Sequence, residues 1–177
     1  MKEVYLLTGR PATGKTSLIK QVASHMKGKA GGFYTEEIRS RGVREGFKLI
    51  MLDGGETTLA HVDIRSPYRV SKYGVDVDVL DRVGVPALRK AVLQRNLVII
   101  DEIGKMELFS DYFRETVLWV INSGKKVLGT IMLNPYPWTD SVKRQPQVNL
   151  INITRDNSRQ VQEELFRWLG ITEFLKL

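Results

Sequence analysis

Short apolar runs alternate along this chain with stretches whose apolar residues recur at helical spacing. Residues 3–8 form an apolar run with strand character, and the apolar positions of residues 14–27 lie on one face of a helix. The same alternation returns later in the chain, with predicted strands over 97–100, 126–132 and 148–153 and predicted helices over 111–123 and 157–170. Strands that alternate with helices predict a three-layer α/β fold around a mostly parallel central sheet.

The middle of the chain departs from this alternation. Three consecutive runs have strand character, at 32–38, 47–52 and 57–62. Residues 53–56 form a turn between the last two, so these strands predict an antiparallel β excursion at one edge of the sheet. Residues 63–74 predict a loop, and the helical stretch after them is interrupted at Pro86, which suits the first turn of a second helix. No repeat or linker is present, so residues 1–177 are expected to form a single domain.

The segment between the first strand and the first helix carries a motif with a defined chemistry. It has the form G-x-x-x-x-G-K-T and is followed by a serine: Gly9, Arg10, Pro11, Ala12, Thr13, Gly14, Lys15, Thr16 and Ser17. Its glycines let the backbone turn tightly and bring N–H groups onto phosphate oxygens. Lys15 offers a positive charge to the β- and γ-phosphates of a nucleotide, and Thr16 offers a hydroxyl to Mg²⁺. The segment therefore predicts a phosphate-binding loop, or P-loop.

A second motif ends the apolar strand in the middle of the chain. Its residues are Leu97, Val98, Ile99, Ile100, Asp101, Glu102, Ile103 and Gly104. Asp101 stands at the tip of a core strand, where a carboxylate can hold Mg²⁺, and Glu102 can polarise a water aimed at the γ-phosphate. About 85 residues separate this motif from the P-loop, which leaves room for an intervening strand in the sheet. That spacing favours a RecA-like strand order over the nucleotide-kinase order, in which the two strands are neighbours.

Two segments resemble the signatures of a known family: Gly32 to Arg39 and Ile99 to Leu108. The family is the small nucleoside-triphosphatase family, whose members are single-domain P-loop NTPases found in thermophiles and in animals, where the protein is called cancer-related nucleoside-triphosphatase. The resemblance covers nearly the whole chain, from the P-loop to Thr154. The proline-containing loop from Arg10 to Thr13 is a mild variant that still fits the family pattern.

The resemblance implies a RecA-like α/β core and hydrolysis of ATP, GTP and other nucleoside triphosphates (NTPs) to the diphosphate. By the family motif, Lys15 and Glu102 carry over as catalytic residues, and Thr16 and Asp101 as the residues that hold Mg²⁺. Two alternatives stay open. One is a nucleotide or small-molecule kinase with an acceptor pocket in the 33–62 region, and the other is a nucleotide-dependent ATPase that binds nucleic acid.

Several further residues are candidates on weaker grounds. Thr130, in the predicted strand 126–132, could contact the γ-phosphate or the attacking water, and Lys105 could neutralise developing charge. Both also fit ordinary strand and surface positions. A catalytic arginine could come from the basic group around a predicted turn: Arg39, Arg41 and Arg44.

Further candidates would serve the base and the metal. The residues between the last strand and the last helix, a usual place to hold a nucleotide base, are Thr154, Arg155 and Asn157. Glu36 or Glu37 could order the water shell of Mg²⁺. His25 and His61 have no ligand spacing to a third donor, so no protein metal site other than the one for Mg²⁺ is expected.

Composition narrows the class of protein without adding a site. The chain has a hydrophobic fraction of 42%, a formal net charge of +7 and no cysteine. The lack of cysteine excludes disulfides and thiolate metal sites, and no apolar run approaches the roughly 20 residues that span a bilayer. The first strand also begins close to the N-terminus and leaves no room for a signal peptide, so we expect a cytoplasmic protein with no membrane partner. We also expect a monomer. The basic residues are dispersed, so nucleic acid is a weak candidate partner.

Overall fold

A computed structural model describes residues 2–172, which form one nine-stranded sheet in the order β5-β6-β4-β3-β2-β7-β8-β1-β9. One half of the sheet is parallel and consists of β1 (Val4–Thr8), β2 (Ala30–Ser40), β7 (Leu97–Ile103), β8 (Lys126–Ile131) and β9 (Val148–Asn152). The order places β8 between β1 and β7. The intervening strand that the sequence spacing predicted is therefore present, and it separates the P-loop strand from the strand that carries Asp101.

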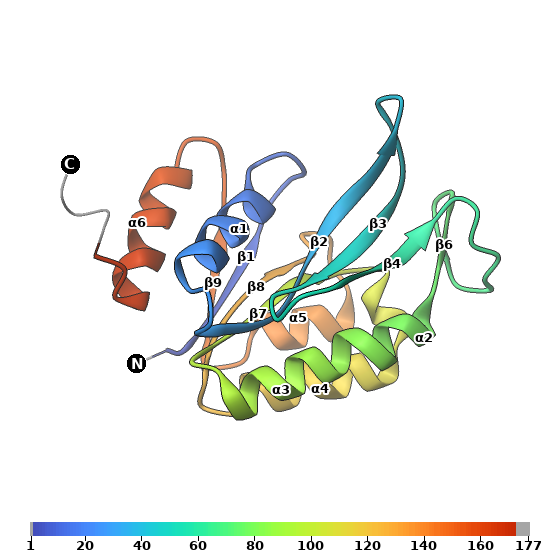
Figure 1. Ribbon diagram of the computed structural model, residues 1–177. Coiled ribbons are helices and arrows are strands. Elements are labelled where there is room, and N and C mark those ends of the chain that lie inside the picture. The colour runs from blue at the N-terminus through green and yellow to red at the C-terminus, as the bar shows by residue number, and fades with distance from the viewer. Residues whose placement is uncertain (1, 173–177) are drawn as a thin grey trace.

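The antiparallel excursion continues the same sheet from its β2 side. It consists of β3 (Val43–Met51), β4 (Glu56–His61), β5 (Arg69–Val70) and β6 (Tyr73–Val75). β2 joins the two halves, because its first residues pair with β7 and its later residues pair with β3. The β2–β3 hairpin extends beyond the rest of the sheet (Figure 1). The sheet thus has a parallel half and an antiparallel excursion at one edge, as the sequence predicted.

The prediction of a loop over residues 63–74 is partly wrong, since β5 and the start of β6 lie there. Such short strands give no alternation that a sequence pattern could reveal. The backbone at Gly74 of β6 packs closely against Ile64, because a Cβ atom at this position would lie 1.9 Å from the Ile64 carbonyl oxygen. Only a residue without a side chain allows that approach.

Helices cover both faces of the sheet (Figure 1). One face carries α1 (Lys15–His25) and α6 (Ser158–Leu169), and the other carries α3 (Val85–Gln94), α4 (Asp111–Ile121) and α5 (Pro137–Lys143). Two hydrophobic clusters result, and neighbouring residues of β1 contribute to different ones: Leu6 packs toward Phe113, and Leu7 packs toward Ile19. Adjacent strand residues point to opposite faces, so the apolar run of β1 serves both clusters. Among the described helices, none combines the length and the apolar composition needed to cross a membrane.

The helical stretch around Pro86 continues without a full break. It runs through α2 (Val77–Val79), a π-helical turn (Leu80–Gly84) and α3, in which Pro86 occupies the first turn as expected. Proline lacks the N–H and its ring crowds the carbonyl one turn earlier. The wider π turn accommodates that crowding, so the predicted interruption takes the form of a local widening.

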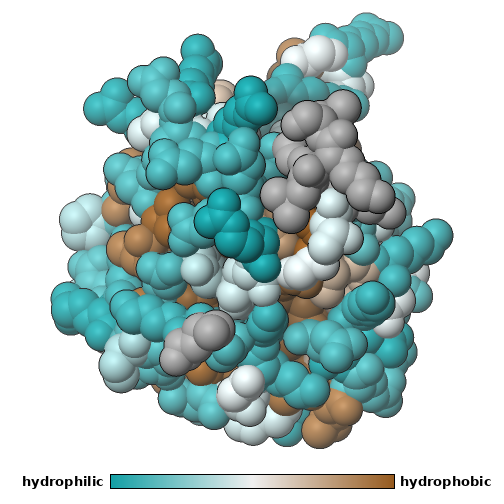
Figure 2. Space-filling view, turned by 90° about the vertical axis from the view of Figure 1, so that its left-hand side faces the viewer, coloured by the Kyte–Doolittle hydropathy of each residue, from teal (hydrophilic) through white to brown (hydrophobic). Residues whose placement is uncertain are grey.

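The last helix begins and ends where the sequence indicates, but its N-terminal contact differs. Asn157 occupies the N-cap position of α6 without forming a capping hydrogen bond to the helix. Its side chain turns back instead, since Oδ1 accepts from the Thr154 N–H and Nδ2 donates to the Asn152 carbonyl. Gly170 ends the helix in a left-handed conformation, with φ of 69°. Figure 2, which faces the α6 side, shows a mostly hydrophilic surface with hydrophobic residues in small separate areas.

Candidate functional site

The P-loop connects β1 to α1 and its shape depends on its two motif glycines. Gly14 has φ of 90° directly before the first helical residue, and Gly9 has φ of 149° directly after β1. A Cβ atom on Gly9 would lie 2.5 Å from the Ile153 carbonyl oxygen, at the end of β9. The loop therefore passes too close to the neighbouring strand for any side chain at Gly9. This is the tight turn that the motif predicts.

Lys15 lies over the loop that precedes it. Its Nζ donates to the Gly9 carbonyl at 2.9 Å and to the Arg10 carbonyl at 2.8 Å. Partial burial lowers the pKa of Lys15, while the charges of Glu102 and Asp101 oppose that change. The ammonium group is thus held by the loop carbonyls and lies within the field of the acidic pair.

Asp101 is 1% exposed, and its two carboxyl oxygens have different surroundings. Oδ1 accepts a hydrogen bond from the Thr130 hydroxyl at 2.6 Å, whereas the buried Oδ2 has no hydrogen-bond partner among the described residues. Burial raises the pKa of Asp101, and the hydroxyl groups of Thr130 and Thr16 counteract that rise. A buried oxygen without a partner, close to a threonine hydroxyl, fits the oxygen ligands that Mg²⁺ requires. Asp101 and Thr16 are therefore the residues that could hold this ion.

Glu102 follows Asp101 directly and is also mostly removed from water. Burial raises the pKa of Glu102 and the Asp101 charge adds to the effect, while Lys15 opposes it. A carboxylate with a raised pKa accepts a proton more readily than an exposed one. The strand position predicted for Glu102 thus gives it the electrostatic setting of a general base.

The two weaker candidates near the acidic pair, Thr130 and Lys105, have different surroundings. Thr130 lies on β8 beside β7 and donates to Asp101, so it holds a carboxylate in place and has no free hydrogen for a substrate. Lys105 lies on the exposed turn after β7. The contact between Thr130 and Asp101 depends on the pairing of β7 with β8, which no local motif encodes.

The candidates on the β2–β3 hairpin form surface ion pairs. Glu37 accepts from Arg39 Nε at 2.7 Å and from Arg44 Nη1 at 3.1 Å, and Glu36 pairs with Lys20 at 2.7 Å. These contacts place both arginines and both glutamates in ion pairs at the surface, and their roles in catalysis and metal binding stay predictions. The same hairpin turns at Arg41 and Gly42, whose positive φ values of 49° and 78° fit a two-residue turn.

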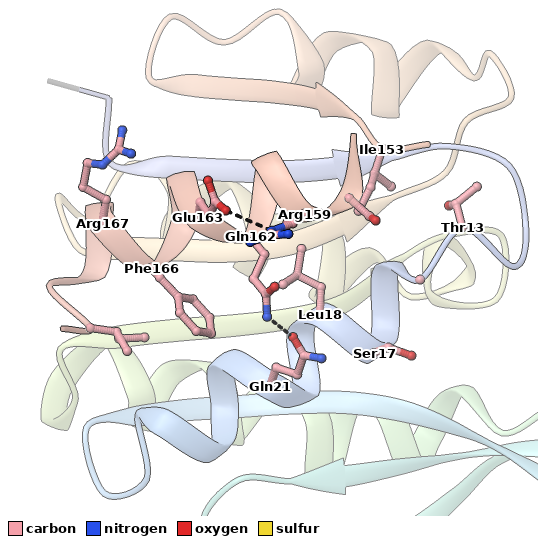
Figure 3. Close-up of a pocket in the computed structure, with 13 residues that line it drawn as sticks. Thr13, Ser17, Leu18, Gln21, Ile153, Arg159, Gln162, Glu163, Phe166 and Arg167 are labelled. Atoms are coloured by element: carbon pink, nitrogen blue, oxygen red, sulfur yellow. Dashed lines mark hydrogen bonds and ion pairs between the residues drawn. The ribbon is translucent and has the colours of Figure 1, made fainter. Parts of the chain in front are cut away.

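A groove adjoins the P-loop between α1 and α6 (Figure 3). It has a volume of about 740 Å³, and its lining includes Thr13 and Ser17 from the P-loop side and Arg159 and Gln162 from α6. Across the groove, the Gln162 side-chain amide donates to the Gln21 side-chain carbonyl. The α6 residues were not among the predicted site residues, because the polar face of an amphipathic helix gives no sign of what it faces.

Comparison with known proteins assigns the chain to a family. A family profile described as NTPase matches residues 4–166, which is most of the chain. The chain belongs to this NTPase family. The match includes both the P-loop and the segment from Asp101 to Glu107, so the resemblance seen in the sequence is confirmed.

Relatives in the NTPase family cover nearly the same length as this chain. The nucleoside-triphosphatase THEP1 of Thermotoga sp. (strain RQ2) is 46% identical over 160 residues, which are 90% of this chain and 91% of that protein. The crystal structure of THEP1 from Aquifex aeolicus has a TM-score of 0.85 at 34% identity and covers 94% of this chain and 98% of its own. The solution structure of a human cancer-related nucleoside triphosphatase has a TM-score of 0.80 at 31% identity, with 96% and 97% covered.

Proposed function

We propose that this protein is a Mg²⁺-dependent nucleoside-triphosphatase that converts an NTP and water to the nucleoside diphosphate (NDP) and phosphate. One observation carries the proposal: the P-loop and the Asp101–Glu102 pair lie at the same edge of the sheet, on strands separated only by β8. Membership in the NTPase family supports the same reaction. The order of these strands and the helices on both faces support assignment to the three-layer RecA-like class.

The proposed reaction uses placement and charge more than covalent chemistry. The oxygen of a water attacks the γ-phosphorus, the bond to the β–γ bridging oxygen breaks, and the diphosphate leaves. Glu102 takes the proton that the water loses, and Lys15 neutralises charge on the β- and γ-phosphates. Thr16 and Asp101 would hold Mg²⁺, which when bound supplies further charge neutralisation at the phosphates. Thr130 fixes the orientation of Asp101 through its hydroxyl.

The groove between α1 and α6 is the proposed place for the base and the ribose. One end of the groove adjoins Thr13 and Ser17, so a nucleotide held by its phosphates on the loop can extend into it. Thr154 and Asn157 close the loop beside it through their mutual hydrogen bonds of 2.8 and 3.3 Å. A cytoplasmic location and a monomeric state belong to the same proposal, and the lack of cysteine is consistent with the location.

The test measures nucleotide affinity and phosphate release for Glu102→Gln and Asp101→Asn while Mg²⁺ is varied. We expect Glu102→Gln to bind NTP as the wild type does and to turn over at about 1% of the wild-type rate or less, at every Mg²⁺ concentration. Asp101→Asn should recover in part at high Mg²⁺, because its defect lies in holding the ion. The exposed Glu115 on α4 provides the matched control, and Glu115→Gln should retain full turnover.

Two further arms separate the proposal from its alternatives. Adding candidate acceptors tests for phosphorylated product, which would identify a kinase. Adding RNA at moderate salt tests for stimulated turnover, which would identify a nucleic-acid-dependent ATPase. If Glu102→Gln keeps most of its turnover, or loses binding as badly as turnover, Glu102 is not the base and the kinase reading becomes the better one.

A further inference from the structure

A third carboxyl group lies buried behind the acidic pair, and the proposed reaction does not use it. Glu107 begins the 3₁₀ turn Glu107–Phe109 that follows β7, and it is 4% exposed. Burial raises the pKa of Glu107 well above its ordinary value, and the charge of Glu102 adds to the effect. An ionisable group is rarely placed in such surroundings without a partner, so its contacts indicate what it does.

The contact of Glu107 is with the backbone of Gly104. Its Oε2 accepts a hydrogen bond from the Gly104 N–H at 3.2 Å. The Gly104 carbonyl accepts in turn from the Leu108 N–H at 3.0 Å. Both backbone polar groups of Gly104 are therefore held by the residues of the next turn, which fixes this glycine relative to the end of β7.

The Glu102 side chain in turn lies against Gly104. A Cβ atom on Gly104 would lie 2.5 Å from Glu102 Oε1 and 3.1 Å from Glu102 Cδ. The three nearest atoms to that position all belong to the Glu102 side chain. The Glu102 side chain therefore lies directly against the position that a side chain at Gly104 would occupy.

From these two contacts we infer that Glu107 is a positioning residue for Glu102 and acts through Gly104. The inference rests on the proposed role of Glu102 as general base. It assigns Glu107 no contact with the substrate: the Glu107 carboxyl holds the Gly104 amide, and Gly104 supports the carboxylate that takes the proton. A shift of this support moves the base relative to the attacking water, and small displacements of a catalytic group reduce turnover strongly.

The first test compares two substitutions at Glu107. Glu107→Gln keeps a side-chain oxygen that can accept from the Gly104 N–H, whereas Glu107→Leu removes it at similar volume. We expect Glu107→Leu to lower kcat by roughly tenfold or more with nucleotide affinity within about twofold of wild type. Glu107→Gln should stay within about threefold of the wild-type kcat. Equal kcat for the two variants and the wild type would overturn the inference.

The second test places the defect at Glu102. In a Glu102→Gln background, Glu107→Leu should lower the residual turnover by less than about twofold, because the group it positions is already disabled. If Glu107→Leu lowers kcat by the same factor in the wild-type and Glu102→Gln backgrounds, Glu107 acts elsewhere. Thr116→Val serves as a control for buried substitutions, since the buried Thr116 hydroxyl has no partner among the described residues. Its kcat should equal that of the wild type.

Gly104→Ala keeps the inference testable if Glu107→Leu fails to fold. The three atoms nearest to the added methyl group all belong to the Glu102 side chain, so the methyl group should displace the base and lower kcat while nucleotide affinity is kept. Unchanged kcat in Gly104→Ala would overturn the inference. The outcomes also separate the two proposals: active Glu102→Gln refutes the proposed base, whereas inactive Glu102→Gln with normal Glu107→Leu and Gly104→Ala refutes only the positioning role.

Discussion

At the scale of single residues, the site combines one cation with three buried or half-buried carboxyl groups. Lys15 is the cation that links the P-loop to the acidic pair, because it lies within the field of Glu102 and Asp101. Its side chain extends from the first residue of α1 and belongs to neither hydrophobic cluster. Loss of Lys15 should therefore affect chemistry far more than stability.

Lys15→Ala tests this separation. We expect kcat for NTP hydrolysis to fall by much more than tenfold, or about 1.4 kcal/mol in activation free energy, because the charge on the β- and γ-phosphates is lost. The melting temperature should stay within a few degrees of the wild type. Phosphate release and thermal unfolding measure the two quantities, and a variant that keeps a tenth of the wild-type kcat would contradict the P-loop assignment.

Glu107 predicts a pH dependence of stability. Its pKa is raised in the folded chain, so above about pH 4.5 the unfolded chain loses this proton while the folded chain keeps it. The folded state then binds more protons, and the free energy of unfolding falls as pH rises. Glu107→Gln removes this pH-dependent contribution. Between pH 5 and 7 the free energy of unfolding of the variant should therefore rise by roughly 1 kcal/mol or more relative to that of the wild type.

Urea unfolding of both proteins, without nucleotide and with Mg²⁺ removed, measures that difference. Glu115→Gln, which changes an exposed glutamate, is the reference and should run parallel to the wild type over the same pH range. A constant difference between Glu107→Gln and the wild type from pH 5 to 7 would show that the folded chain does not hold the proton.

The residues that could be predicted from sequence are those whose role is local. The P-loop and the Asp101–Glu102 pair occupy fixed places in short motifs, so spacing alone identifies them. The partners of these residues could not be predicted in the same way. Thr130 reaches Asp101 only because β8 pairs with β7, and Glu107 faces Gly104 only because a 3₁₀ turn folds back beneath it.

At the scale of secondary structure, β2 is the element on which the mixed sheet depends. It pairs with β7 in parallel and with β3 in antiparallel orientation, and the change takes place next to Gly32 and Phe33. Gly32 has φ of 100°, and a Cβ atom there would lie 2.1 Å from the Ile99 carbonyl oxygen. A side chain at this position would therefore have to push β2 away from β7.

Gly32→Ala should lower the free energy of unfolding by several kcal/mol, because strain from the positive φ adds to a clash with backbone. Gly124→Ala is the matched control, since Gly124 also has a positive φ, of 78°, but has no atom within 4 Å of the new methyl group. It should cost only about 1 kcal/mol. Chemical denaturation of both variants measures the difference, and similar losses would mean that β2 can move away from β7 easily.

The elements themselves were largely predictable where they are long, and less so where they are short. The parallel strands and the long helices have clear apolar periodicity, and each was found near its predicted place. β5 and β6 were missed because strands of two and three residues have no periodicity of their own. They form through pairing with each other and with β4, and no local sequence pattern reveals these contacts.

At the scale of the whole molecule, the arrangement directs the chemistry to the terminal phosphate. In the proposed reaction the P-loop amides would hold the α- and β-phosphates, and the acidic pair lies across β8 from the loop. Phosphate should therefore be released from ATP or GTP and not from ADP or GDP as sole substrate. Steady phosphate release from a diphosphate at a rate similar to that from its triphosphate would contradict this arrangement.

The strand β8, which lies between β1 and β7, also sets the distance between these two strands. Neighbouring strands are about 4.8 Å apart, so the ends of β1 and β7 stand roughly 9.6 Å from each other, with β8 between them. In the proposed reaction, a γ-phosphate bound at the loop and the attacking water would both have to fit within that width. The width of one strand would thus act as a spacer between the loop that binds the phosphates and the proposed base Glu102, and the nucleophilic water would occupy the gap between them.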